Sequence, residues 1–171
     1  MVSTMIMISN LHINGMIKGL ELIGQLTIQY FQIEINKMRK IKDNYGNLLC
    51  ILYKDKDWVE GLNFITEDNL FIQVGSWWYQ EGKKLAKHKH NIVPRESDIT
   101  QEMVYVKSGS MKAIIFDDHL NHIEDLVLNT GDLAIMTNGA HGYEILENNT
   151  KILEAKNGPF LSVEVDKVKY E

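Results

Sequence analysis

The chain has 171 residues, of which 44% are hydrophobic and 24% charged, and its formal net charge is −5 at pH 7. This length and balance predict one globular domain with a sizeable core, and they exclude a disordered or collagen-like chain. The acidic balance argues against nucleic acid as the main partner, because phosphate binding requires a basic face.

The compartment is predicted from the cysteine count and the apolar runs. The single cysteine, Cys50, excludes a disulfide framework and fits a reducing cytoplasm. No uninterrupted apolar run approaches the roughly 18 residues of a membrane span. The first four residues lack the basic region of a secretory signal. We therefore expect a cytoplasmic protein without membrane contact.

Residues 1–37 differ in pattern from the remainder and are predicted to form an N-terminal extension. Apolar residues recur there at helical spacing: Ile13, Met16, Ile17, Leu20 and Ile23. Glycines interrupt this stretch, each weakening a helix by roughly 1 kcal/mol, and residues 26–30 alternate as a strand would. The sequence leaves helix and strand open here, and it places the main domain at residues 38–171.

The main domain is predicted to be all-β. Short apolar runs separated by Gly, Asn and Asp clusters predict strands over residues 48–53, 71–79, 85–90, 101–107, 111–116, 122–128, 132–136, 142–147 and 151–155. A helical turn is expected within residues 58–66. Many short strands without intervening helices indicate a sandwich or barrel.

The first candidate for chemistry is the pair His88 and His90. Residues two apart on a strand point to one face, so the predicted strand 85–90 would project both imidazoles together. Neutral imidazole is a good ligand for zinc, iron, nickel or copper. On its own, this spacing is also typical of two surface histidines.

The residues around this pair resemble the two signature motifs of the cupin superfamily. Gly82 precedes His88 by five intervening residues, and Glu102 precedes Gly109 by six. A second strand opens with Gly131-Asp132 and ends in Asn138-Gly139-Ala140-His141. The resemblance covers about residues 70–156. The stretch 71–79 and the sequence around His141 also look like a group of small bacterial cupins with no assigned reaction.

The resemblance implies a double-stranded β-helix, the jelly-roll barrel of cupins, enclosing one divalent metal ion. Matched residue by residue, it implies that the metal ligands are His88, His90, Glu102 and His141. Such a donor set suits Fe, Mn, Ni, Co or Zn. Eleven residues separate His90 from Glu102, where cupins commonly have three or four, so residues 91–101 are expected to form an inserted loop.

Further residues are candidates for contact with a substrate. Tyr143 lies two positions beyond His141, so on a strand it would share that face and could act as a proton donor. Gln73 and Trp77 share one face of the predicted strand 71–79. Arg95, in the inserted loop, could bind a carboxylate or phosphate through its guanidinium group. Glu102 is alternatively a general base.

Three functions remain open at this stage. The first is a metal-dependent enzyme acting on a small polar molecule, such as a sugar derivative or a hydroxy or keto acid, by isomerisation or dioxygen-dependent oxidation. The second is a non-catalytic binding or sensor module. The third is a metal-independent sugar-nucleotide isomerase or epimerase with His88 or His90 as base. Because jelly rolls protect their sheet edges, we also expect a homodimer with residues 1–37 or the strand near Leu48 at the contact.

Overall fold

The computed structural model describes residues 38–170, and the predicted extension, residues 1–37, lies outside them. The regular secondary structure of the described chain is almost entirely β-strand, which confirms the predicted all-β class. In chain order the elements are β1 (Arg39–Lys42), β2 (Leu48–Tyr53), the 3-10 helix η1 (Asp55–Asp57), β3 (Gly61–Phe64), β4 (Gly75–Trp78), β5 (Glu102–Ser108), β6 (Ser110–Phe116), β7 (His122–Asn129), β8 (Leu133–Met136), β9 (Ala140–Ile145), β10 (Lys151–Lys156) and α2 (Val163–Asp166). Within residues 38–170, no helix has the length and apolar character needed to span a membrane.

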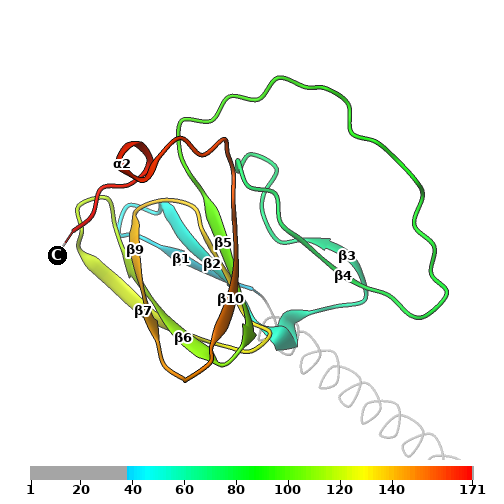
Figure 1. Ribbon diagram of the computed structural model, residues 1–171, viewed down its shortest axis with the longest axis horizontal. Helices are drawn as coiled ribbons and strands as arrows, with labels where there is room; N and C mark the ends of the chain where they lie inside the picture. Colours follow the sequence, from blue (N-terminus) through cyan, green and yellow to red (C-terminus); the bar gives the residue numbers. More distant parts are fainter. Residues whose placement is uncertain (1–37, 171) are drawn as a thin grey trace, which may run out of the picture. The chain divides into compact units, whose positions relative to one another are not determined.

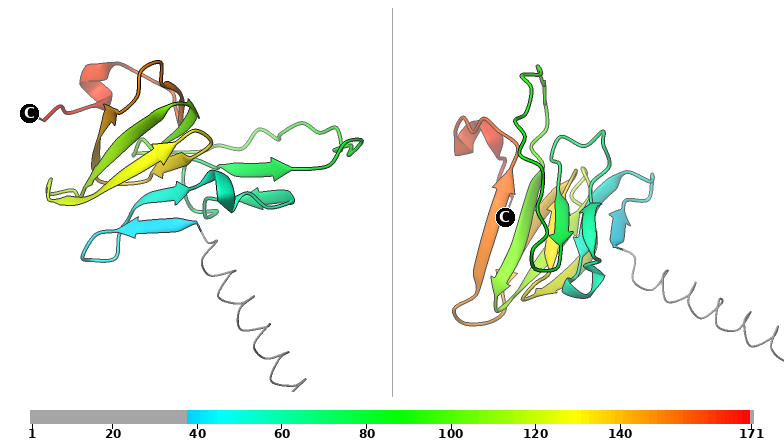
Figure 2. Two further views of the ribbon diagram at one scale, coloured as in Figure 1. Left: turned by 90° about the horizontal axis from the view of Figure 1, so that it is seen from below. Right: turned by 90° about the vertical axis from the view of Figure 1, so that its right-hand side faces the viewer.

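The strands form three antiparallel sheets (Figure 1). The largest has the order β1-β2-β8-β5-β10, the second has the order β7-β6-β9, and the third is the two-stranded sheet of β3 and β4. Figure 2 shows the five-stranded and three-stranded sheets as two layers. Within the described chain β9 pairs only with β6, and β10 only with β5. The expected barrel is therefore not closed, and the two layers remain open along β9 and β10.

The main core lies between these two layers. Alternate residues of each strand point into it, as the pleat of a strand requires. On β5 these are Glu102, Val104 and Val106, and on β6 they include Ala113 and Ile115. The full cluster of buried side chains contains Ile41, Leu49, Cys50, Leu52, Val104, Val106, Met111, Ala113, Ile115, Leu126, Leu128, Ala134 and Met136.

The five-stranded sheet is buried on its other face as well. Ile51, Tyr53, Leu133 and Ile135 form a second cluster there with Ile65, which follows β3. This double burial explains why residues 48–53 form a continuous apolar run rather than an alternating one. The predicted strand over these residues is confirmed as β2.

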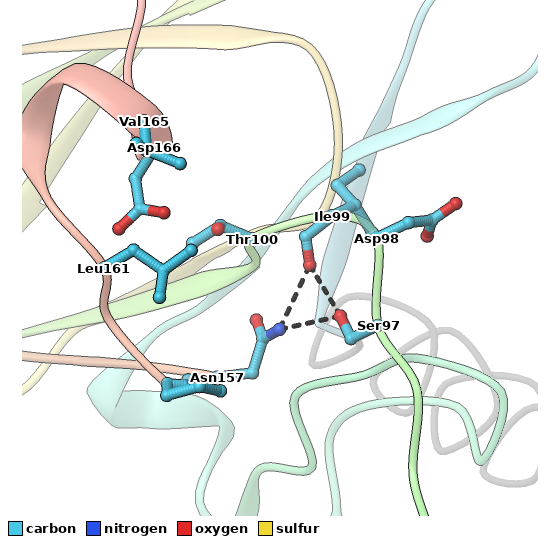
Figure 3. A pocket seen from close by; sticks show the side chains of 10 residues that line it. Ser97, Asp98, Ile99, Thr100, Asn157, Leu161, Val165 and Asp166 are labelled. Carbon is cyan, nitrogen blue, oxygen red and sulfur yellow. Dashed lines mark hydrogen bonds between the residues drawn. The ribbon is translucent and has the colours of Figure 1, made fainter.

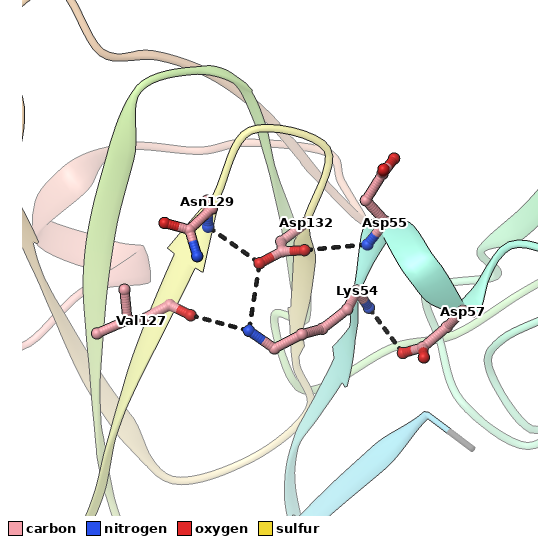
Figure 4. Close-up of polar contacts among 6 residues, drawn as sticks. All are labelled: Lys54, Asp55, Asp57, Val127, Asn129 and Asp132. Carbon is pink, nitrogen blue, oxygen red and sulfur yellow. Dashed lines mark hydrogen bonds and ion pairs between the residues drawn. The ribbon is translucent and has the colours of Figure 1, made fainter. Parts of the chain in front are cut away.

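A buried carboxylate joins η1 to the turn between β7 and β8 (Figure 4). The Asp132 carboxylate accepts hydrogen bonds from the backbone amides of Asp55 and Asn129, both at 3.0 Å. The Lys54 ammonium lies 3.4 Å from the same carboxylate. These contacts lie at the opposite end of β8 from Met136 and hold that end of the sandwich together.

Most predicted strands are confirmed, namely those now seen as β2, β4 and β5 to β10, although β4 is shorter than predicted. Two predictions are wrong. The helical turn expected within residues 58–66 is replaced by η1 just before that range and by β3. Residues 85–90 form no strand, because the whole stretch 80–98 is exposed and pairs with no other strand. Without alternating apolar residues, this stretch has no face to bury.

Candidate active site

Glu102, the first residue of β5, is the most buried of the predicted site residues, with 4% of its surface exposed. Strand pairing places it in a row across the inner face of the five-stranded sheet. Lys156 of β10 lies on one side of it, and Met136 of β8 and then Cys50 of β2 lie on the other. The carboxylate therefore lies between a cation at the sheet edge and the apolar core.

His141 and Tyr143 approach Glu102 from the opposing sheet. Both are on β9, where they pair with Ile115 and Ala113 of β6. Because those two partners belong to the core, His141 and Tyr143 also face inward. Their ring centroids are 5.2 Å apart. The prediction that Tyr143 shares the face of His141 is confirmed.

These residues form one polar cluster, which we call the Glu102 cluster: Glu102, His141, Tyr143 and Lys156. His141 Nε2 lies 2.8 Å from Glu102 Oε1, and the Tyr143 hydroxyl donates a hydrogen bond of 2.8 Å to the same oxygen. The Lys156 ammonium lies 3.7 Å from Glu102 Oε2. It also forms an ion pair of 2.6 Å with Glu154 on its own strand.

The surroundings of Glu102 keep its carboxyl group ionised. Burial acts to raise its pKa, but the hydrogen bonds from His141 and Tyr143 and the nearby charges oppose this and lower the pKa to about 2. Burial and the negative charge of Glu102 together raise the pKa of Tyr143 above its ordinary value. At neutral pH the cluster therefore contains a fixed carboxylate that accepts a hydrogen bond from a fully protonated phenol.

In the pair formed with Glu102, His141 is the side chain that is accessible to solvent. Its side chain is 26% exposed, whereas that of Glu102 is 6% exposed. Nε2 is directed to Glu102, and within residues 38–170 Nδ1 has no hydrogen-bond partner. A carboxylate that orients an imidazole and stabilises its protonated form is the arrangement used by general acid–base pairs.

The turn before β9 fixes the position of His141. Gly139 has a φ of +71°, and a Cβ atom at this position would lie 2.3 Å from the carbonyl oxygen of Phe116. The Thr137 hydroxyl donates to the carbonyl of Leu48 at 2.7 Å. The buried amide of Gln101 donates to the carbonyl of Thr137 at 3.0 Å. Gln101, the residue before Glu102, thus positions the turn that precedes His141.

The structure does not bring His88 and His90 to this cluster. Both lie in the exposed stretch 80–98, which runs apart from the sheets in Figures 1 and 2. Their ring centroids are 5.3 Å apart. Within residues 38–170, no group of three His, Cys, Asp or Glu side chains is placed to hold a metal ion. Of the four predicted ligands, Glu102 and His141 lie together in this arrangement, and His88 and His90 lie apart from them.

The three predicted substrate-binding residues lie outside the cluster. Arg95 is exposed in the same irregular stretch. The Gln73 amide donates to the carbonyls of Glu67 at 3.0 Å and Leu70 at 2.7 Å, so it closes a local turn. Trp77 lies on the outer face of β4, with 54% of its surface exposed.

Lys156 was missed by the sequence analysis. No motif marks it, because its place beside Glu102 follows from the register of β10 against β5. Alternation within residues 151–155 predicts a strand, but it does not predict the partner of that strand.

A pocket of about 550 Å³ lies beside the start of β5 and the end of β10, beginning two residues before Glu102 and one residue after Lys156 (Figure 3). It is lined by residues 97–100, 157–159, 161, 165 and 166. The Asn157 amide donates to the Ser97 hydroxyl at 2.9 Å and to the carbonyl of Ile99 at 3.0 Å. Asn157 also accepts a hydrogen bond of 2.7 Å from the backbone of Gln101. The volume lies within the range of small-molecule sites.

Comparison with known proteins identifies no relative. No protein-family model, curated protein sequence or solved structure matches the chain. The resemblance to cupins therefore rests on its motif residues alone.

Proposed function

We propose that the chain binds a small polar molecule at the Glu102 cluster and exchanges a proton with it through His141. The observation that supports this is the 2.8 Å contact between the partly exposed imidazole and a buried, ionised carboxylate. The carboxylate holds the imidazole in one orientation and stabilises its protonated form. In this proposal the proton exchange is independent of a metal ion, and His141 acts as the base.

The other members of the cluster favour a substrate that carries oxygen atoms. Lys156, whose side chain is 27% exposed, offers a cation to a carbonyl, carboxylate or phosphate oxygen beside His141. Tyr143 holds Glu102 Oε1 and remains protonated. The adjoining pocket provides polar groups, including the Thr100 hydroxyl, for the rest of the molecule. A sugar derivative or a hydroxy or keto acid has this chemistry.

The test is exchange of a carbon-bound hydrogen with solvent. Sugars, sugar phosphates and keto acids would be incubated with the protein in D₂O, and loss of the proton signal next to the carbonyl group would be followed by NMR. The variants His141→Asn and Glu102→Gln should lose exchange by at least about 100-fold. His119→Asn, which alters an exposed histidine in a turn, is the matched control. Exchange by His141→Asn at the wild-type rate would exclude the proposed role of His141.

A second candidate is the metal-dependent enzyme implied by the cupin resemblance. The observation that favours it is the close approach of the His88 and His90 rings, in a stretch with no buried residue to hold it in place. Approach of this stretch to Glu102 and His141 would complete a set of three imidazoles and one carboxylate. A metal ion bound there would polarise a carbonyl group or activate water.

Metal content of protein purified without an affinity tag tests this second candidate. If the four residues form one site, the double variant His88→Ala/His90→Ala and the variant Glu102→Gln should each lose the metal. A matched pair, His119→Ala/His122→Ala, alters two other histidines near a turn and should retain it. Equal metal content in all variants would exclude the four-ligand site.

A further inference from the structure

Beyond the proposed function, we propose that the outer face of the β3–β4 hairpin binds a second copy of this chain. The strand register places Leu62 opposite Trp77, and Phe64 opposite Gly75, on one face of the hairpin. These three large side chains, which we call the hairpin face, are 45%, 54% and 66% exposed for Leu62, Trp77 and Phe64. Gly75 has no side chain, and the Cδ1 atoms of Leu62 and Phe64 lie 3.6 Å from the position that its Cβ atom would take.

The hairpin points its polar side inward. Asn63 pairs with Ser76 on the face that covers the five-stranded sheet, and Ser76 is 3% exposed. Its hydroxyl lies 3.0 Å from that of Tyr53. A surface hairpin usually buries its apolar side and exposes its polar side. The reversal here leaves an apolar surface that the described chain does not cover.

The hairpin face is large enough to form the apolar centre of a dimer interface. A free aromatic side chain has about 150–250 Å² of surface, so the exposed parts of the hairpin face total roughly 250–350 Å². A standard interface buries about 800 Å² on each partner, and roughly 60% of that area is apolar. The hairpin face therefore supplies more than half of the apolar share of such an interface.

The arrangement of the four positions is self-complementary. Two copies related by a two-fold axis present the same patch to each other. With the axis parallel to the strands, Phe64 of one copy lies over Gly75 of the other. With the axis across the strands, Trp77 lies over Gly75. Either symmetry places an aromatic ring against the position that lacks a side chain.

The expected contact differs from both contacts suggested by the sequence. The strand near Leu48 is β2, which pairs with β1 on one side and β8 on the other, so it has no free edge. Residues 1–37 lie outside the described chain. The hairpin face lies within residues 38–170, and strand alternation directs it outward.

The test is the mass of the full chain in solution, measured by sedimentation equilibrium from 1 to about 100 μM. The wild type should approach twice the chain mass of 19.7 kDa. Phe64→Thr/Trp77→Thr should weaken dimerisation by about 100-fold or more, because each substitution acts twice across the two-fold axis. Leu153→Thr, which alters a similarly exposed apolar residue on β10, is the matched control and should dimerise like the wild type.

A second variant covers the case in which the double variant fails to fold. Leu62→Lys keeps both aromatic rings and places two like charges at the interface, so it should also weaken dimerisation. A wild type that remains monomeric over the whole concentration range would overturn the proposal. This applies also if the reason is that residues 1–37 cover the hairpin face. Dimerisation of folded Phe64→Thr/Trp77→Thr at the wild-type affinity would also overturn it.

Discussion

The variant Glu102→Gln should change how the stability of the protein depends on pH. The pKa of Glu102 is lowered from an ordinary value of 4.5 to about 2 in the folded chain. Each pKa unit corresponds to about 1.4 kcal/mol, so ionised Glu102 contributes about 3 kcal/mol to the free energy of unfolding. Because the folded pKa is the lower one, this contribution is fully present above pH 4.5 and is lost as the pH falls towards 2.

The variant replaces the carboxylate by a neutral group of similar shape, so it resembles the acid form of the wild type. Wild type and variant should therefore differ by about 3 kcal/mol at pH 7 and converge near pH 2. The assay is urea unfolding followed by tryptophan fluorescence at pH 7, 5, 4, 3 and 2. The variant Glu81→Gln removes an exposed carboxylate and controls for the loss of one charge.

A difference between wild type and Glu102→Gln that stays constant with pH would refute this reasoning. It would mean that the carboxylate is not held ionised by His141 and Tyr143 in the folded chain. A loss of stability equal to that of Glu81→Gln at pH 7 would mean that the hydrogen bonds to Glu102 contribute nothing measurable.

Two further predictions concern the turn before β9 and the hydroxyl group of Tyr143. Gly139→Ala should destabilise the chain by about 2 kcal/mol or more, because the new Cβ would meet the carbonyl of Phe116, and it should also reduce proton exchange. Gly46→Ala shares the positive φ but has open space around it, so thermal unfolding should show a smaller loss, about 1 kcal/mol. Tyr143→Phe removes a hydrogen bond that lowers the pKa of Glu102, so the acid-unfolding midpoint should move to higher pH. An unchanged midpoint would contradict that assignment.

The strand pattern and part of the site could be predicted from the sequence. Residues 101–155 contain short apolar runs separated by turn residues, and the structure has β5 to β10 there. The same alternation placed Tyr143 on the face of His141. Both predictions use only spacing along one strand, which is a local property.

The remaining errors have tertiary causes. His88 and His90 could share a strand face only if residues 85–90 paired with another strand, and residues 80–98 pair with none in the described chain. Alternation in the hairpin indicates two faces, but it does not say which one covers the core, so the outward direction of Trp77 was not predictable. The place of Lys156 beside Glu102 depends on strand register, which no local pattern encodes.

The most direct test of the central claim is the exchange of a carbon-bound substrate hydrogen with solvent, catalysed by protein treated with a chelator. The rate is compared between His88→Ala/His90→Ala and His141→Asn. If the Glu102 cluster carries the chemistry, the first variant should exchange at the wild-type rate and the second should be inactive. Loss of exchange in His88→Ala/His90→Ala, with activity retained in His141→Asn, would contradict the assignment of the site to Glu102, His141 and Tyr143.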